Sequence, residues 1–345
     1  MSNHASAMVP AARPDEDLDR VVCLGKALGE PLRARILQVL HQDSYSVSEL
    51  CILFDVPQPA LSHHLKILLT AGLVARRREG NSIFYRRAAL AAGGIAGSLI
   101  AALDQLPLPP DLRQRVVAIH QARNHTSARF FAQNARQIAS HQAQICEPAV
   151  YADVVLAMME NALGEGLGNG QVLEIGPGSG ALLIALARRF RQAVGVDNAQ
   201  PMLRRAEAAL KDEHGVRLRH QDFMTLPRQR RYDALVAAMV VHHQASPAAF
   251  FAQAARVLRP GGALIVAELC RHDQQWASQA CGDLWLGFDP EELQHWAAGT
   301  GFSVRESQYL AQKNGFRIQI HRFRSGTAKT TDKRTESTHD RLQSC

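Results

Sequence analysis

Residues 172–180, Val-Leu-Glu-Ile-Gly-Pro-Gly-Ser-Gly, constrain the fold of this chain more than any other stretch. An apolar run leads directly into three glycines at alternate positions, Gly176, Gly178 and Gly180, and helical composition resumes over residues 181–187. This order predicts a strand, a tight turn and a helix. Glycines in such a turn permit positive φ and let a ligand approach the backbone beside a helix N-terminus. Taken alone, the stretch leaves a nucleotide site and a plain tight turn equally open.

The residues around this turn predict a mainly parallel sheet, because short apolar runs alternate with helical segments and the last two strands form a hairpin. The expected strands cover residues 172–175, 193–197, 216–218, 232–238, 263–268, 302–310 and 316–323. Asp197 ends the second of these strands, 17 residues after Gly180. A carboxylate at that distance can accept hydrogen bonds from ribose hydroxyls in a Rossmann-like fold. The spacing therefore indicates a ligand that contains a nucleoside.

The first ninety residues have a different pattern, in which short helices precede a hairpin. Helices are expected from residue 17, from Pro31, over 46–53 and over 58–70, and strands over 73–78 and 82–87. Residues 58–87 contain six Lys and Arg against one acid, Glu79. A basic helix and hairpin of this kind suit the phosphate backbone and major groove of DNA. The plainer interpretation is a solvated basic surface, and the pattern favours DNA binding over it.

Residues 30–37, 58–68, 71–74 and 77–85 resemble the ArsR-type winged helix-turn-helix of bacterial repressors. The resemblance covers residues 18–87 and implies a transcriptional regulator that binds a double-stranded DNA operator, usually as a repressor. Metal-sensing members often carry Cys-x-Cys in the third helix, whereas here Cys51 is followed by Leu53, so no metal site is predicted. The residues expected to face DNA are Gln58, Ser62, His63, His64, Lys66, Arg76, Arg77, Arg78 and Asn81.

A helical connector is expected between this module and the glycine turn. Residues 88–103 resemble the dimerisation helix of the ArsR family, which implies a homodimer, and residues 111–145 and 150–163 have helical patterns. No apolar run approaches the roughly 18 residues needed to span a membrane. Residues 1–20 lack the apolar core of a signal peptide, and the six cysteines are scattered without a C-x-x-C pair. Together these features predict a cytoplasmic protein with free thiols.

Two nucleotide classes compete for the glycine turn, dinucleotides and S-adenosylmethionine (SAM). The G-x-G-x-G pattern, with Glu174 two residues before its first glycine, departs from the G-x-G-x-x-G of NAD sites. Together with Leu-Arg-Pro-Gly-Gly at 258–262 and the final hairpin, it resembles a class I SAM-dependent methyltransferase over residues 171–324.

This resemblance implies SAM as the cofactor and assigns parts of it to residues. The glycines would pass its methionine part, Asp197 would hold the ribose, Asp222 would accept from the adenine amino group, and Phe223 would pack near the ring. Met239, at the end of the fourth strand, would lie beside the sulfonium. The implied cofactor residues are Glu174, Gly176, Gly178, Gly180, Asp197, Asp222, Phe223 and Met239.

The catalytic candidates follow the fourth and fifth strands. His242, His243 and Gln244 come after the fourth strand, and Glu268 ends the fifth. Methyl transfer to a good nucleophile needs mainly positioning, and a base only where a proton must leave. His242 is the candidate catalytic residue. His242 and His243 could serve as a base or as a polar lid, and a positioning role is preferred. Residues 270–288 carry Trp276, Trp285 and Phe288, which could cap an acceptor pocket or belong to the core.

The sequence thus predicts two domains, a mainly α winged helix-turn-helix and an α/β Rossmann-like methyltransferase fold. The expected ranges are 17–105 for the DNA-binding domain, 106–165 for the connector, 166–324 for the methyltransferase domain and 325–345 for a disordered tail. The predicted function is a DNA-binding transcriptional regulator whose second domain methylates a small molecule. The alternative is a non-enzymatic regulator that senses SAM or S-adenosylhomocysteine (SAH).

Overall fold

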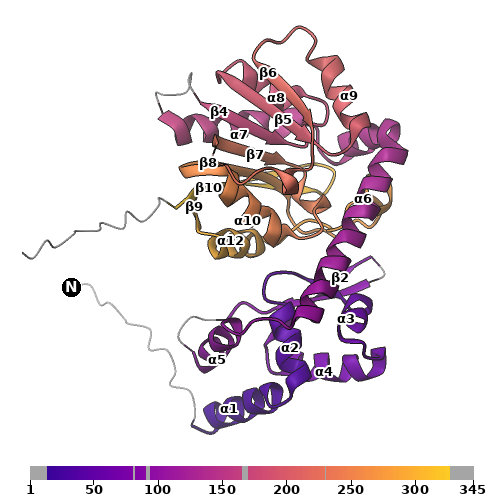
Figure 1. The fold of residues 1–345 in the computed structure, drawn as a ribbon, viewed down its shortest axis with the longest axis vertical. Helices are drawn as coiled ribbons and strands as arrows, with labels where there is room; N and C mark the ends of the chain where they lie inside the picture. The colour runs from indigo at the N-terminus through magenta and orange to yellow at the C-terminus, as the bar shows by residue number, and fades with distance from the viewer. Residues whose placement is uncertain (1–13, 81, 91–93, 165–169, 230, 327–345) are drawn as a thin grey trace, which may run out of the picture.

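The computed structural model describes residues 14–80, 82–90, 94–164, 170–229 and 231–326. An N-terminal and a C-terminal domain are joined by α6 (Pro110–Ile145), which runs along one side of both (Figure 1). Asn81, residues 327–345 of the predicted disordered tail and residues 165–169 lie outside the described residues.

The N-terminal domain is the predicted winged helix, with one strand that the sequence did not reveal. Its helices are α1 (Pro14–Leu28), α2 (Pro31–Val39), α3 (Val47–Phe54), α4 (Gln58–Thr70) and α5 (Ile95–Asp104), and its strands are β1 (Tyr45–Ser46), β2 (Val74–Glu79) and β3 (Ser82–Arg87). The strands pair antiparallel in the order β1-β3-β2. The strand β1 is only two residues long and pairs with the hairpin, so no period-two pattern marks it in the sequence.

The core of this domain follows from helical spacing. Leu61, Leu65 and Leu68 of α4 are fully buried and lie on one side of the helix. Ser46 caps α3 with a capping box, because its hydroxyl accepts from the Glu49 amide and the Glu49 carboxylate accepts from the Ser46 amide. These local devices explain why the helices of this domain could be predicted from the sequence.

The C-terminal domain is built on a seven-stranded sheet in the order β6-β5-β4-β7-β8-β10-β9. The strands are β4 (Gln171–Ile175), β5 (Gln192–Asp197), β6 (Val216–His220), β7 (Tyr232–Ala238), β8 (Leu258–Leu269), β9 (Phe302–Ala311) and β10 (Arg317–Ser325). All neighbours pair parallel except β10, which is antiparallel to both β8 and β9. The Leu-Arg-Pro-Gly-Gly run at residues 258–262, whose sequence predicts a turn, lies within β8 at an irregularity in its pairing with β7.

Helices cover both faces of this sheet, and a hydrophobic core lies between the sheet and the helices on each face (Figure 1). The helices α7 (Pro148–Leu163), α8 (Ala181–Ala187) and α9 (Gln200–Ala209) pack on one face, and α10 (Pro247–Val257) and α12 (Pro290–Gly299) on the other. A short helix, α11 (Trp276–Cys281), lies against α6. Among the described helices, no segment has the length and apolar character required to cross a membrane.

Candidate functional site

The glycine turn after β4 has the backbone that its sequence requires. Gly176, Gly178 and Gly180 have φ of 65°, 54° and 80°, the left-handed region that side chains with a Cβ disfavour. A Cβ at Gly176 would lie 3.0 Å from a methyl carbon of Val240, so the turn packs closely against the loop after β7. Gly180 is the N-cap of α8. The turn therefore leaves backbone, rather than side chains, facing the hollow beyond β4.

Two hollows meet at this turn. The first, of about 100 Å³, is lined by five of the predicted cofactor residues besides Gly176, namely Gly178, Asp197, Asp222, Phe223 and Met239. The second, of about 390 Å³, is lined by Glu174, Tyr151, Cys146, Cys281, His242 and Asp283 among others. Gly176, Gly178 and Met239 line both. A ligand in the first hollow would thus present one end to the second.

The acidic residues of the first hollow are held in place by backbone amides. An Asp197 carboxylate oxygen accepts from the Ala199 amide at 2.8 Å, and one of Asp222 accepts from the Met224 amide at 2.9 Å. Burial raises the pKa of Asp197 to about 6, against the lowering effect of its backbone hydrogen bonds. Each carboxylate keeps acceptor capacity for a ligand.

Glu174 lies at the centre of the sheet, in register with Gly195 of β5 and Val236 of β7. It is 3% exposed, and its Oε2 atom has no hydrogen-bond partner among the described residues. Burial raises the pKa of this carboxyl to about 8. A buried carboxyl without a partner is costly, and its position in the wall of the larger hollow suits a cationic or hydrogen-bond-donating ligand.

His242 and Glu268 form a buried pair at the carboxyl ends of β7 and β8, adjacent parallel strands. Nδ1 of His242 lies 2.8 and 2.7 Å from the two oxygens of the Glu268 carboxylate. Nε2 lies 3.6 Å from Asp283 Oδ1. Burial lowers the pKa of His242, but the charges of Glu268 and Asp283 outweigh that effect and raise it to about 9. Glu268 thereby fixes the ring and leaves Nε2 on the side of Asp283.

Sequence reasoning missed Asp283, Tyr151 and the part of α6 that lines the site. Asn124, Ser127 and Phe131 of α6 line the smaller hollow. These residues come from elements far apart in the chain, so no short motif connects them. The only local indication of a site residue was the acidic side chain of Asp283 in a segment rich in apolar and aromatic residues. Of the proposed caps, Trp285 and Phe288 are buried in the core on the α10 side of the sheet, and Trp276 packs against Phe316.

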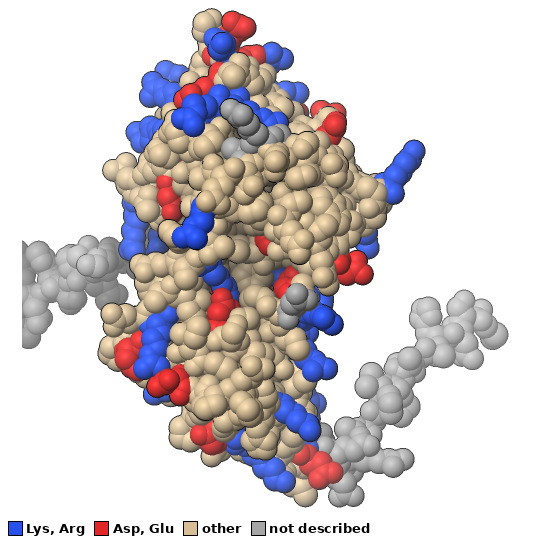
Figure 2. All heavy atoms as spheres, turned by 90° about the vertical axis from the view of Figure 1, so that its right-hand side faces the viewer, with Lys and Arg blue, Asp and Glu red and all other residues tan. Residues whose placement is uncertain are grey.

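On the N-terminal domain, most of the predicted DNA-facing residues are open. Gln58, Ser62, His63 and Lys66 are exposed along α4, on the far side of the domain from the large sheet (Figure 1), and Arg76 and Arg78 are exposed on β2. His64 is half-buried, with Nδ1 3.4 Å from a Glu30 carboxylate oxygen. Figure 2 shows basic side chains along the edges of the lower, N-terminal domain on the face that carries α6.

The prediction that Arg77 faces DNA is wrong for this structure. Its side chain is 4% exposed and lies between the domains, 2.5 Å from Glu79 and 3.1 Å from Glu292 of α12. Its guanidinium also lies over the rings of Trp285 and Phe288. The strand β2 alternates its side chains, so Arg77 points away from Arg76 and Arg78, toward the second domain.

Comparisons with known proteins identify both domains. The model described as "Bacterial regulatory protein, arsR family" matches residues 30–76, and "Methyltransferase domain" matches residues 173–266. A "Biofilm growth-associated repressor" of Agrobacterium fabrum is 39% identical over 80 residues, which cover 23% of this chain and 68% of the relative.

Three further similarities follow the same division. The "HTH-type transcriptional repressor SmtB" of Mycobacterium tuberculosis is 43% identical over 79 residues, 23% of this chain, and the match spans 58% of that relative's length. A "Ubiquinone biosynthesis O-methyltransferase" of Leptothrix cholodnii is 23% identical over 155 residues, 40% of this chain and 66% of the relative. The structure of magnesium protoporphyrin IX methyltransferase from Synechocystis with bound SAH aligns with a TM-score of 0.47 and 17% identity, over 59% of this chain and all of that one. The chain belongs to the arsR family of bacterial regulatory proteins and joins its DNA-binding domain to a methyltransferase domain.

Proposed function

We propose that this regulator binds operator DNA through α4 and transfers a methyl group from SAM to a small-molecule acceptor. The observation that carries the enzymatic part is the pair of hollows that share Gly176, Gly178 and Met239. A nucleoside held in the smaller one would direct its methyl donor at whatever occupies the larger one. Operator binding would place the protein in the cytoplasm.

The cofactor would extend from Asp222 to Glu174. Asp197 would bind the ribose hydroxyls, Asp222 the adenine amino group, and Phe223 would pack near the ring. The methionine part of the cofactor would lie along the backbone of the glycine turn, which ends with Gly180 at the start of α8. The buried carboxyl of Glu174, which lacks a partner in the described structure, would then receive the cationic ammonium group of the methionine part.

The acceptor would occupy the cavity of about 390 Å³, whose walls include Tyr151, Cys146 and His242. This volume suits a small molecule. His242, held by Glu268, would meet the acceptor and fix its reacting atom near the sulfonium. An open cavity of acceptor size beside the methyl position supports an enzyme rather than a sensor of SAM or SAH alone.

Calorimetric titration of the full-length protein with SAM and with SAH tests this proposal. We expect both to bind, and we expect SAH to accumulate, by mass spectrometry, when SAM is incubated with a matching acceptor from a library of small hydroxyl, thiol and amine compounds. Failure of both cofactors to bind would refute the cofactor site. Binding of both, with a change in operator affinity and no acceptor turnover, would favour the sensor.

Lys66→Ala tests the role of α4. Lys66 is exposed on this helix beside Ser62 and His63, where a phosphate contact is expected. We expect weaker operator binding and a slope of log affinity against log salt that is smaller by about one. Fluorescence anisotropy on a selected operator measures both. Lys211→Ala, which removes an exposed charge after α9, serves as the control, and an equal effect of the two variants would argue against α4.

A homodimer through α1 and α5 is also proposed. These helices lie at the same edge of the N-terminal domain (Figure 1) and expose apolar side chains, with Leu18, Val22, Ile95 and Leu99 between 44% and 62% exposed. Val22→Glu with Leu99→Glu should convert the dimer to a monomer and weaken operator binding by more than tenfold, because a half-site contact is lost. Light scattering measures the mass. A wild-type protein that is monomeric at micromolar concentration would contradict the proposal.

A further inference from the structure

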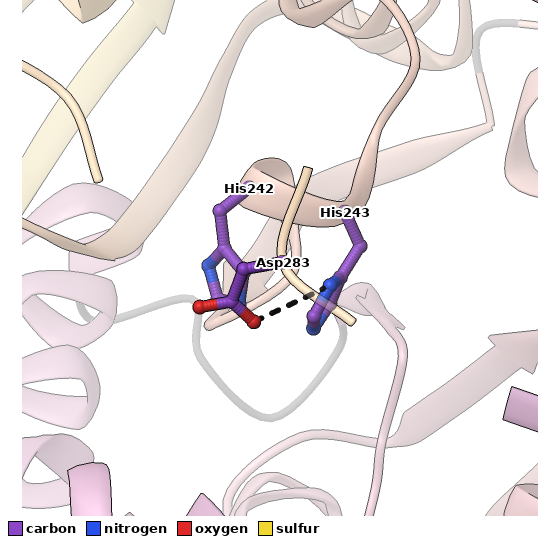
Figure 3. Close-up of side chains that lie close together, drawn as sticks. All are labelled: His242, His243 and Asp283. Carbon is purple, nitrogen blue, oxygen red and sulfur yellow. Dashed lines mark ion pairs between the residues drawn. The ribbon is translucent and has the colours of Figure 1, made fainter. Parts of the chain in front are cut away.

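Three potential metal ligands meet in the wall between the two hollows. His242 and His243 come from the short helix after β7, and Asp283 comes from the loop after α11. Figure 3 shows the Asp283 carboxylate beside both imidazole rings. All three side chains are buried, and one ligand atom from each lies within 4.8 Å of the others. His242 and Asp283 also line the larger cavity.

The spacing of these atoms fits ligands of one ion better than it fits hydrogen bonds. Asp283 Oδ1 lies 3.6 Å from His242 Nε2 and 3.8 Å from His243 Nδ1, both beyond hydrogen-bond length. Two ligands about 2.0–2.1 Å from one tetrahedral zinc ion lie roughly 3.3–3.4 Å apart. The two separations from Asp283 exceed that distance by a few tenths of an ångström, and the ligand atoms of the two histidines lie within 4.8 Å of each other.

The Asp283 carboxylate and one nitrogen of His243 lack hydrogen-bond partners among the described residues. Neither carboxylate oxygen of Asp283, which is 3% exposed, has a hydrogen-bond partner among the described residues. The same holds for His243 Nε2, whereas His243 Nδ1 lies 3.4 Å from the Gly282 carbonyl oxygen. Buried polar atoms are ordinarily paired, so this carboxylate is suited to direct contact with a cation.

The surrounding structure holds the three side chains as a metal site would. The Glu268 carboxylate is hydrogen-bonded to Nδ1 of His242. A carboxylate in this position commonly orients an imidazole that binds a metal ion through its other nitrogen. The amides of Leu284 and Trp285 both donate to the His242 carbonyl, which pins the Asp283 loop to the histidine helix. Asp283 is thus positioned by its backbone, and its side chain is left free.

We propose that His242, His243 and Asp283 bind one divalent transition-metal ion such as Zn²⁺. Two imidazoles and one carboxylate favour such an ion over Mg²⁺ and leave a fourth position open, as catalytic zinc sites do. The open position would face the cavity of about 390 Å³.

The consequence for the reaction rests on the proposed methyl transfer. A hydroxyl or thiol acceptor that occupies the fourth position would lose its proton to water, because the ion lowers the pKa of a bound group. The resulting anion would attack the SAM methyl carbon, the carbon–sulfonium bond would break, and SAH and the methylated acceptor would form. The acceptor class is therefore a small alcohol, phenol or thiol.

Metal analysis of the full-length protein tests the site. The protein is stripped with a chelator, titrated with Zn²⁺, desalted and measured by elemental analysis, and Co²⁺ is titrated in parallel for its visible spectrum. We expect one equivalent per chain in the wild type and a loss of at least tenfold in affinity for Asp283→Asn and for His243→Ala. Asp212→Asn and His214→Gln, which alter exposed residues, should bind as the wild type does.

Asp283→Asn keeps the size of the side chain and should fold, which thermal unfolding and SAH titration of the metal-free protein verify. Absence of a bound ion in the wild type, or full binding by both variants, would overturn the proposal. SAH titration distinguishes failure of the metal site from failure of the proposed methyl transfer. A protein that binds the metal ion but not SAH would support the metal site and contradict the proposed methyl transfer.

Discussion

Glu174→Gln is expected to weaken SAH binding by more than 100-fold and, in the absence of cofactor, to stabilise the protein. The buried carboxyl has no partner for Oε2 within the described structure, so the free protein carries an unpaired group that only the cofactor ammonium would satisfy. Loss of one member of a buried charged hydrogen bond costs about 3 kcal/mol or more, which corresponds to more than 100-fold in affinity. Calorimetric titration with SAH measures the loss.

The gain in stability has a definite pH dependence. Burial raises the pKa of Glu174 from 4.5 to about 8. A group with a raised folded-state pKa contributes stability that is complete below its unfolded pKa and is lost as pH rises through the folded value. The wild type therefore loses stability relative to the glutamine variant between about pH 4.5 and pH 8, on the order of 3 kcal/mol at pH 7.

Thermal unfolding of the two proteins at pH 5, 7 and 8.5, without cofactor, measures this difference. The gap in Tm should widen with pH, and saturating SAH should reverse it by stabilising the wild type alone. Glu207→Gln, an exposed change of the same charge on α9, should show neither effect. A Glu174→Gln protein that binds SAH as the wild type does would remove this residue from the cofactor site.

Both domain folds could be predicted from the sequence because local signals define their elements. The leucines of α4 follow helical spacing, Ser46 and Glu49 mark a capping box, and the glycine turn fixes the junction between β4 and α8. The predicted cofactor residues also follow local motifs at the carboxyl ends of strands, where ligands of such sheets bind. Their roles remain predictions until binding is measured.

The contacts between distant segments could not be predicted in this way. Asp283 follows α11 and meets His242 only because the loop returns to the end of β7, and no spacing in the sequence records that return. The absence of a predicted metal site has the same origin, since the usual signal is a short ligand motif. In the sequence, Arg77 belongs to a basic strand and is indistinguishable from its neighbours. Its side chain is buried because α12 packs against this strand and brings Glu292 to it, which the sequence does not show.

Arg123 is the clearest case of a residue whose importance the sequence hides. It lies on the long helix α6, 8% exposed, and its guanidinium donates to both carboxylate oxygens of Glu49 at 2.8 and 2.7 Å. It also donates to the Ser44 carbonyl in the N-terminal domain and to the Ala245 carbonyl in the C-terminal domain. One side chain therefore ties both domains to the connecting helix.

Arg123→Ala is expected to destabilise the protein by about 3–5 kcal/mol and to separate the unfolding of the two domains. The substitution removes the guanidinium from the Glu49 carboxylate, which keeps only its contacts with Ser46. It also removes both carbonyl contacts and opens space between the rings of Trp285 and Tyr45. Arg123→Lys should recover little of the loss, because an ammonium cannot reproduce the forked contacts.

Chemical denaturation followed by far-ultraviolet circular dichroism and by tryptophan fluorescence measures this effect. Trp285 contacts Phe84 and Trp296 donates to the Gln42 carbonyl, so both lie at the interface between the domains. Their fluorescence should change before most helical signal is lost in the variant, and together with it in the wild type. SAH affinity should also fall, because the neighbouring Asn124 and Ser127 line the smaller hollow. Arg113→Ala, an exposed change on the same helix, should leave one transition and the midpoint unaltered; the same result for Arg123→Ala would show that the domains are held together by other contacts.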